Sequence, residues 1–364
     1  MPLRCIDDAG MCVQSHFLDE HQWAALKAAH KKQRHLRMPC CNELAVLKTS
    51  RLGTQFFAHH RRGECTTKPE SAEHLLLKSL VAQAAVKCGW TVATEVRGQT
   101  EQGEEWVADV LATRGKSRVA LEIQWSRQTE SETYARQARY KKSGVRGLWL
   151  FKQSDFPIDH NVPAVQIIQH ERGVFEAVVK VNNDLLRLSV EEFIHHAFSG
   201  RFWYGLFPPN TSVTATVYGG FVKCWKCDGW TNVVSEVVLE DASGHEVFGL
   251  SLHELPEVPS LMQQLPLSQG IPQLKVGKIL MRYSKTEGGK YLANGCVRCN
   301  ALQGKFFLRE IEHRLKPIIS TKVLVSTALN RSIGELWGYA CCWHLDLPDS
   351  QVSRYYPESQ EQTI

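Results

Sequence analysis

Two apolar segments of the chain carry acidic side chains where a buried strand is expected. The first reads WVADVL over residues 106–111, and the second reads VALEIQW over residues 119–125. Alternate residues of a strand share a face, so Glu122 and Gln124 point the same way and Asp109 shares a face with apolar neighbours. A carboxylate among apolar side chains is costly unless it is paired or binds a metal ion. We therefore expect the two strands to lie side by side and to bring Asp109 and Glu122 to one divalent cation.

The expected cation is Mg²⁺ or Mn²⁺, because carboxylates with open coordination positions suit metals that prefer oxygen ligands and retain water. Such a cation polarises a phosphodiester and lowers the pKa of the attacking water. Gln124 cannot act as a base, so we expect it to orient a water molecule or the substrate. The sequence contains no P-loop, dinucleotide fingerprint or nucleophile elbow, so hydrolysis without a nucleotide cofactor is predicted.

A helix is predicted to begin near Pro69, since proline suits the first turn of a helix or the turn before it. Glu70, Glu73 and His74 follow at a spacing that places them on one helical face with Lys78. Either Glu70 or Glu73 could supply a further carboxylate to the cation, and His74 is another candidate. The alternative is that this polar stripe is only the solvated side of the helix.

A second helix is predicted over residues 130–142, and residues 145–151 have the near-continuous apolar character of a buried strand. Arg136, Arg139 and Tyr140 lie on one face of this second helix, at i, i+3 and i+4. The order helix, three strands, helix, strand is typical of an α/β fold in which helices flank a mixed sheet.

The spacing of Asp109 from Glu122-x-Gln124 resembles that of the PD-(D/E)xK nuclease superfamily in its E-x-Q variant. The usual third residue there is lysine, and Gln124 in its place leaves the general base unassigned. Five short segments in a fixed order are together similar to the competence protein CoiA nuclease-like family, over about residues 1–155. These segments are Phe57-Ala58-His59, Glu70-Ser71-Ala72-Glu73-His74-Leu75, Ala108-Asp109-Val110-Leu111, Glu122-Ile123-Gln124-Trp125-Ser126 and Arg136-Gln137-Ala138-Arg139-Tyr140.

This resemblance implies a restriction-endonuclease-like fold and a role in DNA processing. It favours Glu70 over Glu73 as the carboxylate from the first helix, because Glu70 matches the family's segment. It also implies that the second helix faces DNA, so Arg136 is expected to contact a phosphate, with Tyr140 beside it. Arg139 is either a further phosphate contact or a surface charge.

The twelve cysteines predict metal sites and not disulfides, because no apolar leader or membrane-spanning run suggests an oxidising compartment. We expect a cytoplasmic protein with no membrane partner. Two C-x-x-C pairs, Cys224 with Cys227 and Cys296 with Cys299, predict one tetrahedral Zn²⁺ site of the zinc-ribbon kind. The alternative is a redox-active pair.

A second, smaller Zn²⁺ site is predicted near the N-terminus, and the alternative is that its residues pack in a core. Members of the CoiA family carry a C-P-x-C knuckle in this region, and Met38 stands here at the first cysteine position. The candidate ligands are Cys41, His59 or His60, and Cys65, with Cys40 as an addition.

Four parts of the chain are predicted. They are an N-terminal Cys/His module (1–62), a CoiA-like nuclease core (63–158), a connector (159–210) and a β-rich, zinc-ribbon-containing domain (211–364). The net charge of +5 is compatible with nucleic acid.

The function predicted from these features is that of a metal-dependent nuclease acting on DNA in competence, recombination or defence. The alternative is a non-catalytic adaptor that keeps the nuclease scaffold and holds single-stranded DNA. Other DNA-processing proteins are expected as partners, and the sequence leaves the oligomeric state open.

Overall fold

The computed structural model describes residues 2–61, 65, 69–157, 159–181 and 184–347. The chain divides into two compact units, of which unit 1 comprises Met1–Trp203 and Cys342–Ile364 and unit 2 comprises Tyr204–Cys341. The predicted boundaries at residues 62 and 158 fall outside the described residues. Most of the expected connector, 159–210, is instead part of unit 1, and the chain returns to unit 1 after Cys341.

The elements of unit 1 follow in chain order. They are β1 (Arg4–Ile6), β2 (Cys12–Gln14), the 3-10 helix η1 (Ser15–Phe17), α1 (Glu20–Gln33), β3 (Ala45–Thr49), β4 (Gln55–His59), α2 (Ala72–Lys87), β5 (Thr91–Gln99), β6 (Glu105–Arg114), β7 (Ser117–Gln124), α3 (Glu130–Lys142), β8 (Arg146–Phe151), β9 (Ala164–Gln169), β10 (Phe175–Val181), β11 (Asp184–Ser189), α4 (Val190–Phe198), β12 (Phe202–Gly205) and β20 (Cys342–Leu345).

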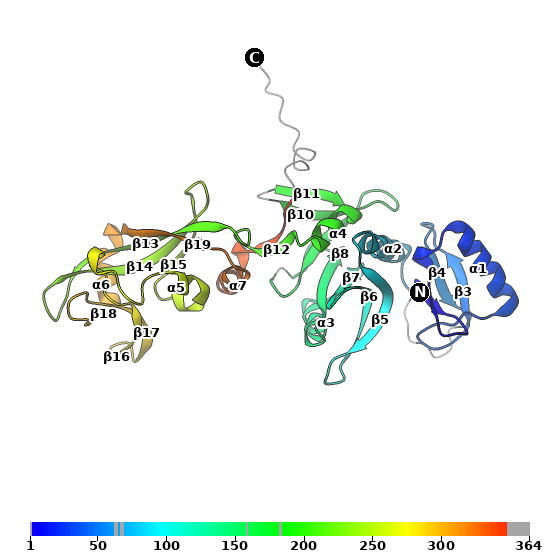
Figure 1. Ribbon diagram of the computed structural model, residues 1–364, viewed down its shortest axis with the longest axis horizontal. Helices are drawn as coiled ribbons and strands as arrows, with labels where there is room; N and C mark the ends of the chain where they lie inside the picture. Colours follow the sequence, from blue (N-terminus) through cyan, green and yellow to red (C-terminus); the bar gives the residue numbers. More distant parts are fainter. Residues whose placement is uncertain (1, 62–64, 66–68, 158, 182–183, 348–364) are drawn as a thin grey trace, which may run out of the picture. The chain divides into compact units, whose positions relative to one another are not determined.

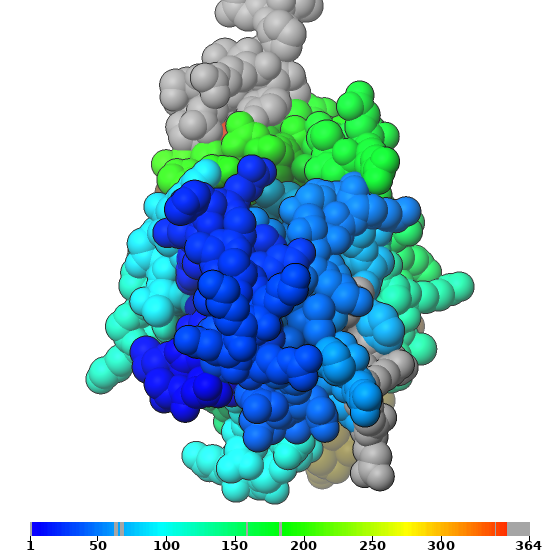
Figure 2. All heavy atoms as spheres, turned by 90° about the vertical axis from the view of Figure 1, so that its right-hand side faces the viewer, coloured from blue at the N-terminus to red at the C-terminus, as the bar shows by residue number. Residues whose placement is uncertain are grey.

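The N-terminal module consists of the hairpins β1–β2 and β3–β4 with helix α1 packed against them (Figure 1). Asp19 begins α1 with a capping box, in which its side chain accepts the N–H of Gln22 at 2.7 Å. Trp23, Met38 and Phe57 form the core of the module with smaller apolar residues. In the space-filling view, this module covers much of the face of unit 1 that is turned toward the viewer (Figure 2).

A mixed sheet forms the centre of unit 1, with the strand order β12-β20-β10-β9-β8-β7-β6-β5 and β11 paired to β10. Strands β5, β6 and β7 are antiparallel neighbours, whereas β7, β8 and β9 are parallel neighbours. Helices α2 and α4 bury apolar residues such as Leu77 and Phe193 on one face of the sheet. Helix α3 covers the other face, where Tyr140 packs with Trp149 (Figure 1). This arrangement confirms the predicted mixed sheet flanked by helices.

Unit 2 contains two antiparallel sheets, with the strand orders β15-β14-β13-β19 and β16-β17-β18. Among the described residues of both units, no helix is long and apolar enough to cross a membrane. The elements of unit 2 are β13 (Ser212–Lys223), β14 (Trp230–Glu240), β15 (Glu246–Ser251), η2 (Leu255–Glu257), α5 (Pro259–Gln264), η3 (Pro272–Leu274), β16 (Leu280–Ser284), β17 (Gly289–Gly295), β18 (Leu302–Gln303), α6 (Lys305–Ile311), η4 (Glu312–Arg314), β19 (Lys316–Leu324), α7 (Thr327–Leu336) and η5 (Gly338–Ala340).

Candidate functional site

Asp109 lies at the point where strands β6 and β7 separate. The ladder between the two strands ends at the pair Val110–Leu121, and Asp109 does not continue it. Its Oδ2 instead accepts the backbone N–H of Ile123 at 3.0 Å. The ladder between β5 and β6 is also interrupted at Glu95, which has a φ of 48° and no partner in that ladder. Such irregularities re-aim side chains, and here the Asp109 carboxylate reaches α2.

Glu70, His74 and Asp109 form a three-residue cluster, whose ligand atoms all lie within 4.8 Å of one another. The Nε2 atom of His74 is 3.3 Å from Oδ2 of Asp109. Ser71 begins α2 by accepting the N–H of His74 at 3.1 Å, so Glu70 lies just before the helix and not on its face as predicted. The structure therefore brings together three of the predicted residues from two separate segments.

Lys78 adds a buried cation to this cluster. Its side chain is 0% exposed, and its Nζ lies 3.0 and 3.1 Å from the two carboxylate oxygens of Glu70. The same Nζ also forms an ion pair with Glu95. Burial acts to lower the pKa of Lys78, but Glu95 and Glu70 outweigh it and raise the pKa above its usual range. In the sequence, Lys78 was only part of a polar helical stripe. Its spacing of i+4 from His74 was the one indication that it lies at the cluster.

The charges around Asp109 keep this carboxylate ionised. Burial acts to raise its pKa, but His74, Lys78 and the N–H of Ile123 outweigh burial and hold the pKa well below the usual range. Burial acts to lower the pKa of His74, but Asp109 outweighs it and the pKa is raised. An ionised carboxylate beside an imidazole and a second carboxylate is a set of groups that can bind a divalent cation.

Glu122 lies next to Asp109 but is engaged on the α3 side of the sheet. Its side chain is 1% exposed and accepts hydrogen bonds from Arg136 and from the hydroxyl of Tyr140. The backbone N–H of Asp109 also bonds to it. Burial raises the pKa of Glu122 to about 7, although Arg136 opposes this shift. The structure does not place Glu122 in the three-residue cluster, because its carboxylate is already held by α3.

Two other candidates from the sequence lie outside the cluster. Glu73 turns toward the N-terminal module, where it forms an ion pair with Arg51. The side-chain amide of Gln124 donates to the backbone oxygen of Ser126 at 2.6 Å. Glu73 and Gln124 therefore have protein partners of their own in this structure.

The predicted nucleic-acid contacts of α3 need one correction. Tyr140 is 0% exposed, so the prediction that it contacts nucleic acid is wrong, and its hydroxyl instead holds Glu122 and the backbone oxygen of Val107. Arg139 donates to the backbone oxygen of Glu105 at 2.9 Å. These residues share one helical face as predicted, but its Tyr140 part packs on the sheet, whereas Arg136 and Arg139 are partly exposed.

The C-x-x-C pairs of unit 2 form two turns with the same backbone geometry. In each turn, the residue after the second cysteine has a φ of 56°, namely Asp228 and Asn300. The N–H of Asp228 bonds to the carbonyl of Cys224 at 3.0 Å, and that of Asn300 bonds to the carbonyl of Cys296 at 2.9 Å. One turn connects β13 to β14, and the other connects β17 to β18. The two sheets of unit 2 therefore meet where the two turns meet.

The four sulfur atoms of these turns converge, with all of them within 4.8 Å of one another. The Sγ atoms of Cys224 and Cys299 are 3.7 Å apart, as are those of Cys227 and Cys296. Four sulfurs at 2.3 Å from a tetrahedral Zn²⁺ would be about 3.8 Å apart, so the spacing fits this metal. Burial acts to raise the pKa of Cys224, but backbone N–H groups of the turn lower it to about 6, which favours the thiolate needed for metal binding.

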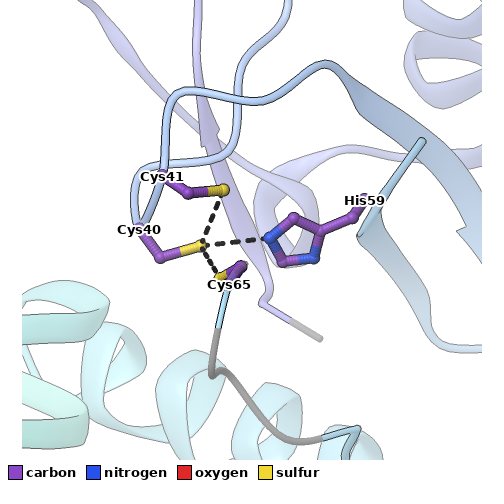
Figure 3. Close-up of side chains that lie close together, drawn as sticks. All are labelled: Cys40, Cys41, His59 and Cys65. Carbon is purple, nitrogen blue, oxygen red and sulfur yellow. Dashed lines mark hydrogen bonds between the residues drawn. The ribbon is translucent and has the colours of Figure 1, made fainter. Parts of the chain in front are cut away.

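A second cysteine cluster lies in the N-terminal module (Figure 3) and consists of Cys40, Cys41, His59 and Cys65. The Sγ of Cys40 is 3.7 Å from that of Cys41, 3.6 Å from that of Cys65 and 3.3 Å from Nε2 of His59. These distances also fit a tetrahedral site, in which adjacent ligands are about 3.6 to 3.8 Å apart. The structure selects His59 over His60, because neighbouring residues at the end of β4 point in opposite directions. The cluster could therefore hold a metal.

The chain was compared with solved structures, curated proteins and protein families. Among solved structures, the chain is similar to a crystal structure of a protein of unknown function, AF1548, at 23% identity and a TM-score of 0.18, covering 21% of this chain and 46% of that one. The chain thus spans less than half of that protein, and no curated protein matches. Residues 70–173 match the family model described as Competence protein CoiA, nuclease-like domain. This match confirms the resemblance inferred from the sequence.

Proposed function

We propose that this chain, whose residues 70–173 carry a CoiA nuclease-like domain, is a metal-dependent nuclease that hydrolyses phosphodiester bonds of DNA. One observation carries the proposal, which is the convergence of Glu70, His74, Asp109 and the buried Lys78 where β6 and β7 separate. Acidic groups and a permanent cation at one irregular point of a sheet are costly for stability, and such costs are typical of functional sites.

The three-residue cluster fits a divalent cation after a small adjustment. Opposite ligands at about 2.1 Å from one cation are about 4.2 Å apart, and the donor atoms of Glu70, His74 and Asp109 lie within 4.8 Å of one another. Two carboxylates suit Mg²⁺ or Mn²⁺, and an imidazole ligand favours Mn²⁺ over Mg²⁺. A cation bound there would polarise the phosphodiester and make water a better nucleophile at neutral pH.

In this proposal, Lys78 supplies from α2 the positive charge that the superfamily usually places two residues after the strand glutamate. Its ammonium group balances Glu70 in the free protein and would stabilise the negative charge that develops on a phosphate bound at the cluster. Gln124 then keeps the role expected from the sequence, which is to orient a water molecule or the substrate. Glu122 would reach the cation only if its bonds to Arg136 and to the hydroxyl of Tyr140 both opened, and Arg136 would then be free to pair with a DNA phosphate.

The two cysteine clusters are proposed to hold structural Zn²⁺. Their ligand types and sulfur spacings fit Zn²⁺ better than a redox-active pair, because each cluster has four ligand groups converging on one point. We propose a reducing, cytoplasmic setting, in which cysteine thiols stay available to a metal. Zn²⁺ binding at the Cys224 cluster would stabilise unit 2, whose sheets meet at that point.

A second candidate function is that of a non-catalytic adaptor for single-stranded DNA. The observation that favours it is the engagement of Glu122 by Arg136 and Tyr140, together with Gln124 in place of lysine. A scaffold in which the strand carboxylate is permanently neutralised would bind nucleic acid without cutting it.

The proposal is tested by incubating the purified chain with supercoiled plasmid, linear duplex, single-stranded DNA and RNA, in Mg²⁺, Mn²⁺ or EDTA. We expect metal-dependent cleavage of DNA that Asp109→Asn and Glu70→Gln abolish. Glu73→Gln is the matched control, because Glu73 lies three residues after Glu70 but pairs with Arg51, and it should keep full activity. Loss of cleavage in Glu122→Gln would support the proposal that Glu122 leaves Arg136 and joins the metal site. Binding without cleavage in every metal would favour the adaptor.

A further inference from the structure

A groove of about 490 Å³ opens on unit 2 beside the end of strand β13. The side chains that line it include Lys275, Arg314 and Lys316, and none of its lining residues is acidic. Among the described residues, none of these three side chains takes part in an ion pair. Arg314 donates to the backbone oxygen of Glu310 at 3.0 Å, and this neutral acceptor does not cancel the positive charge of the guanidinium group. We call this feature the basic groove, and its electrostatic character favours an anionic partner.

Two exposed aromatic side chains accompany the basic groove. Phe221 lines it and is 50% exposed, and Nζ of Lys275 lies 5.7 Å from the centre of its ring. Trp230 is 57% exposed. In the β13–β14 ladder, Phe221 is opposite Asn232 and Lys223 is opposite Trp230, so these four side chains share one face. Diagonal neighbours on such a face are roughly 7 Å apart, so the two rings form neighbouring platforms.

Strand β13 and the turn of Cys224 position this surface. Strand β13 extends past its last pair with β19, at Gly219 and Lys316, which leaves its final residues beside the groove. The turn of Cys224 begins directly after Lys223, and Trp230 follows the same turn. The cysteine cluster therefore fixes the adjoining ends of β13 and β14, which present the aromatic rings.

We propose that the basic groove and the adjoining rings of Phe221 and Trp230 bind single-stranded nucleic acid. The flat faces of unpaired bases can stack on aromatic side chains, and the phosphates between them can pair with lysine and arginine. A duplex offers the same phosphates but hides its base faces, so the exposed rings select for the single-stranded form. This binding requires no hydrolysis, and it adds a second nucleic-acid surface to the one proposed around Asp109.

The aromatic contribution is tested on the full chain by fluorescence anisotropy with labelled 20-nucleotide oligothymidine, oligouridine and duplex DNA, without added divalent metal. We expect single strands to bind more tightly than duplex. Phe221→Ala and Trp230→Ala should each weaken single-strand binding by between about 5-fold and about 100-fold, the range for one lost stacked base. Tyr283→Ala is the matched control, because Tyr283 is a 60% exposed aromatic of unit 2 outside the groove, and it should bind as the unaltered chain does.

The charge contribution is tested by the salt dependence of the same binding. Lys275→Gln and Lys316→Gln should each reduce the slope of log affinity against log salt by about 0.7, the value for one phosphate contact to a single strand. Lys322→Gln, at a lysine that bonds to Thr214 away from the groove, should leave the slope unchanged.

Unchanged binding by both aromatic variants, or tighter binding of duplex, would overturn the proposal. The thymidine and uridine arms show whether DNA or RNA is preferred, and either preference supports it. The binding is measured without divalent metal and requires no cleavage, so failure of the nuclease proposal would not affect this result. Unchanged metal content and melting temperature of each variant show that it is folded.

Discussion

Replacing Lys78 by methionine would leave two carboxylates without the cation they share. Nζ of Lys78 lies 3.0 Å from Glu70 and also pairs with Glu95, and the side-chain exposures of the three residues are 0%, 19% and 17%. Removing one partner of a buried ion pair costs about 3–5 kcal/mol, because the remaining charge is uncompensated. The two acids keep some contact with water, so we expect unit 1 to lose about 3 kcal/mol, the lower end of that range. Methionine has a similar apolar stem, which limits the loss of packing.

The measurement is urea denaturation at pH 7, combined with hydrogen exchange of peptides from β6 and β7 to assign the loss to unit 1. Lys87→Met is the control, because Lys87 lies on the same helix and pairs with Glu191 at 63% and 55% exposure. That exposed pair should contribute less than about 1 kcal/mol. Adding Glu95→Gln to Lys78→Met should recover part of the lost stability, because it removes one of the two orphaned charges. A Lys78→Met chain within about 1 kcal/mol of the unaltered one would refute the reasoning, since a buried pair cannot be broken so cheaply.

Metal analysis of the purified chain should find two Zn²⁺ per molecule, and Cys227→Ser should lose one of them and lower the melting temperature of unit 2. Retention of both metals in that variant would show that the four sulfurs of unit 2 are not the ligands. Cys41→Ser should lose the other Zn²⁺ while unit 2 melts as before. The stability of unit 1 should fall with acid through His16, which is 7% exposed and whose pKa burial lowers to about 4. Because the unfolded chain takes up this proton near pH 6.5 and the folded one does not, His16 should cost no stability above pH 6.5 and up to about 3 kcal/mol as the pH falls to 4. His16→Leu should flatten this part of the pH profile, and an unchanged profile would exclude His16 as its source.

Local features of unit 1 could be predicted from the sequence because neighbouring residues decide them. Helix α3 spans the predicted residues 130–142, since the side chain of Thr129 and that of Glu132 form a capping box at its start. The C-x-x-C spacing likewise identified the cysteines that meet in unit 2, because each pair forms its own turn. The match of residues 70–173 to the nuclease-like family confirms what the short segments indicated.

Domain organisation could not be predicted so well, because strand pairing is long-range. Residues 164–169 form β9, which pairs in parallel with β8, and residues 342–345, which follow unit 2 in the chain, pair with β10. Neither pairing leaves a mark in the sequence of either strand. The expected connector therefore supplies strands β9, β10 and β11 to the sheet and helix α4 to one of its faces.

The acidic strands, the polar residues near the start of α2 and the cysteine pairs could all be identified from residue type and spacing. The tertiary structure alone decided which charges meet. A lysine on a polar helical stripe looks the same whether it faces water or two carboxylates, and Lys78 is buried where Glu95 reaches it from strand β5. Likewise, Asp109 and Glu122 lie on neighbouring strands, but the ladder between these strands ends before Asp109. The side chain of Asp109 therefore contacts α2, whereas that of Glu122 is held by α3. The physical reason is that burial and charge pairing depend on distances between segments, which the local pattern of a chain does not contain.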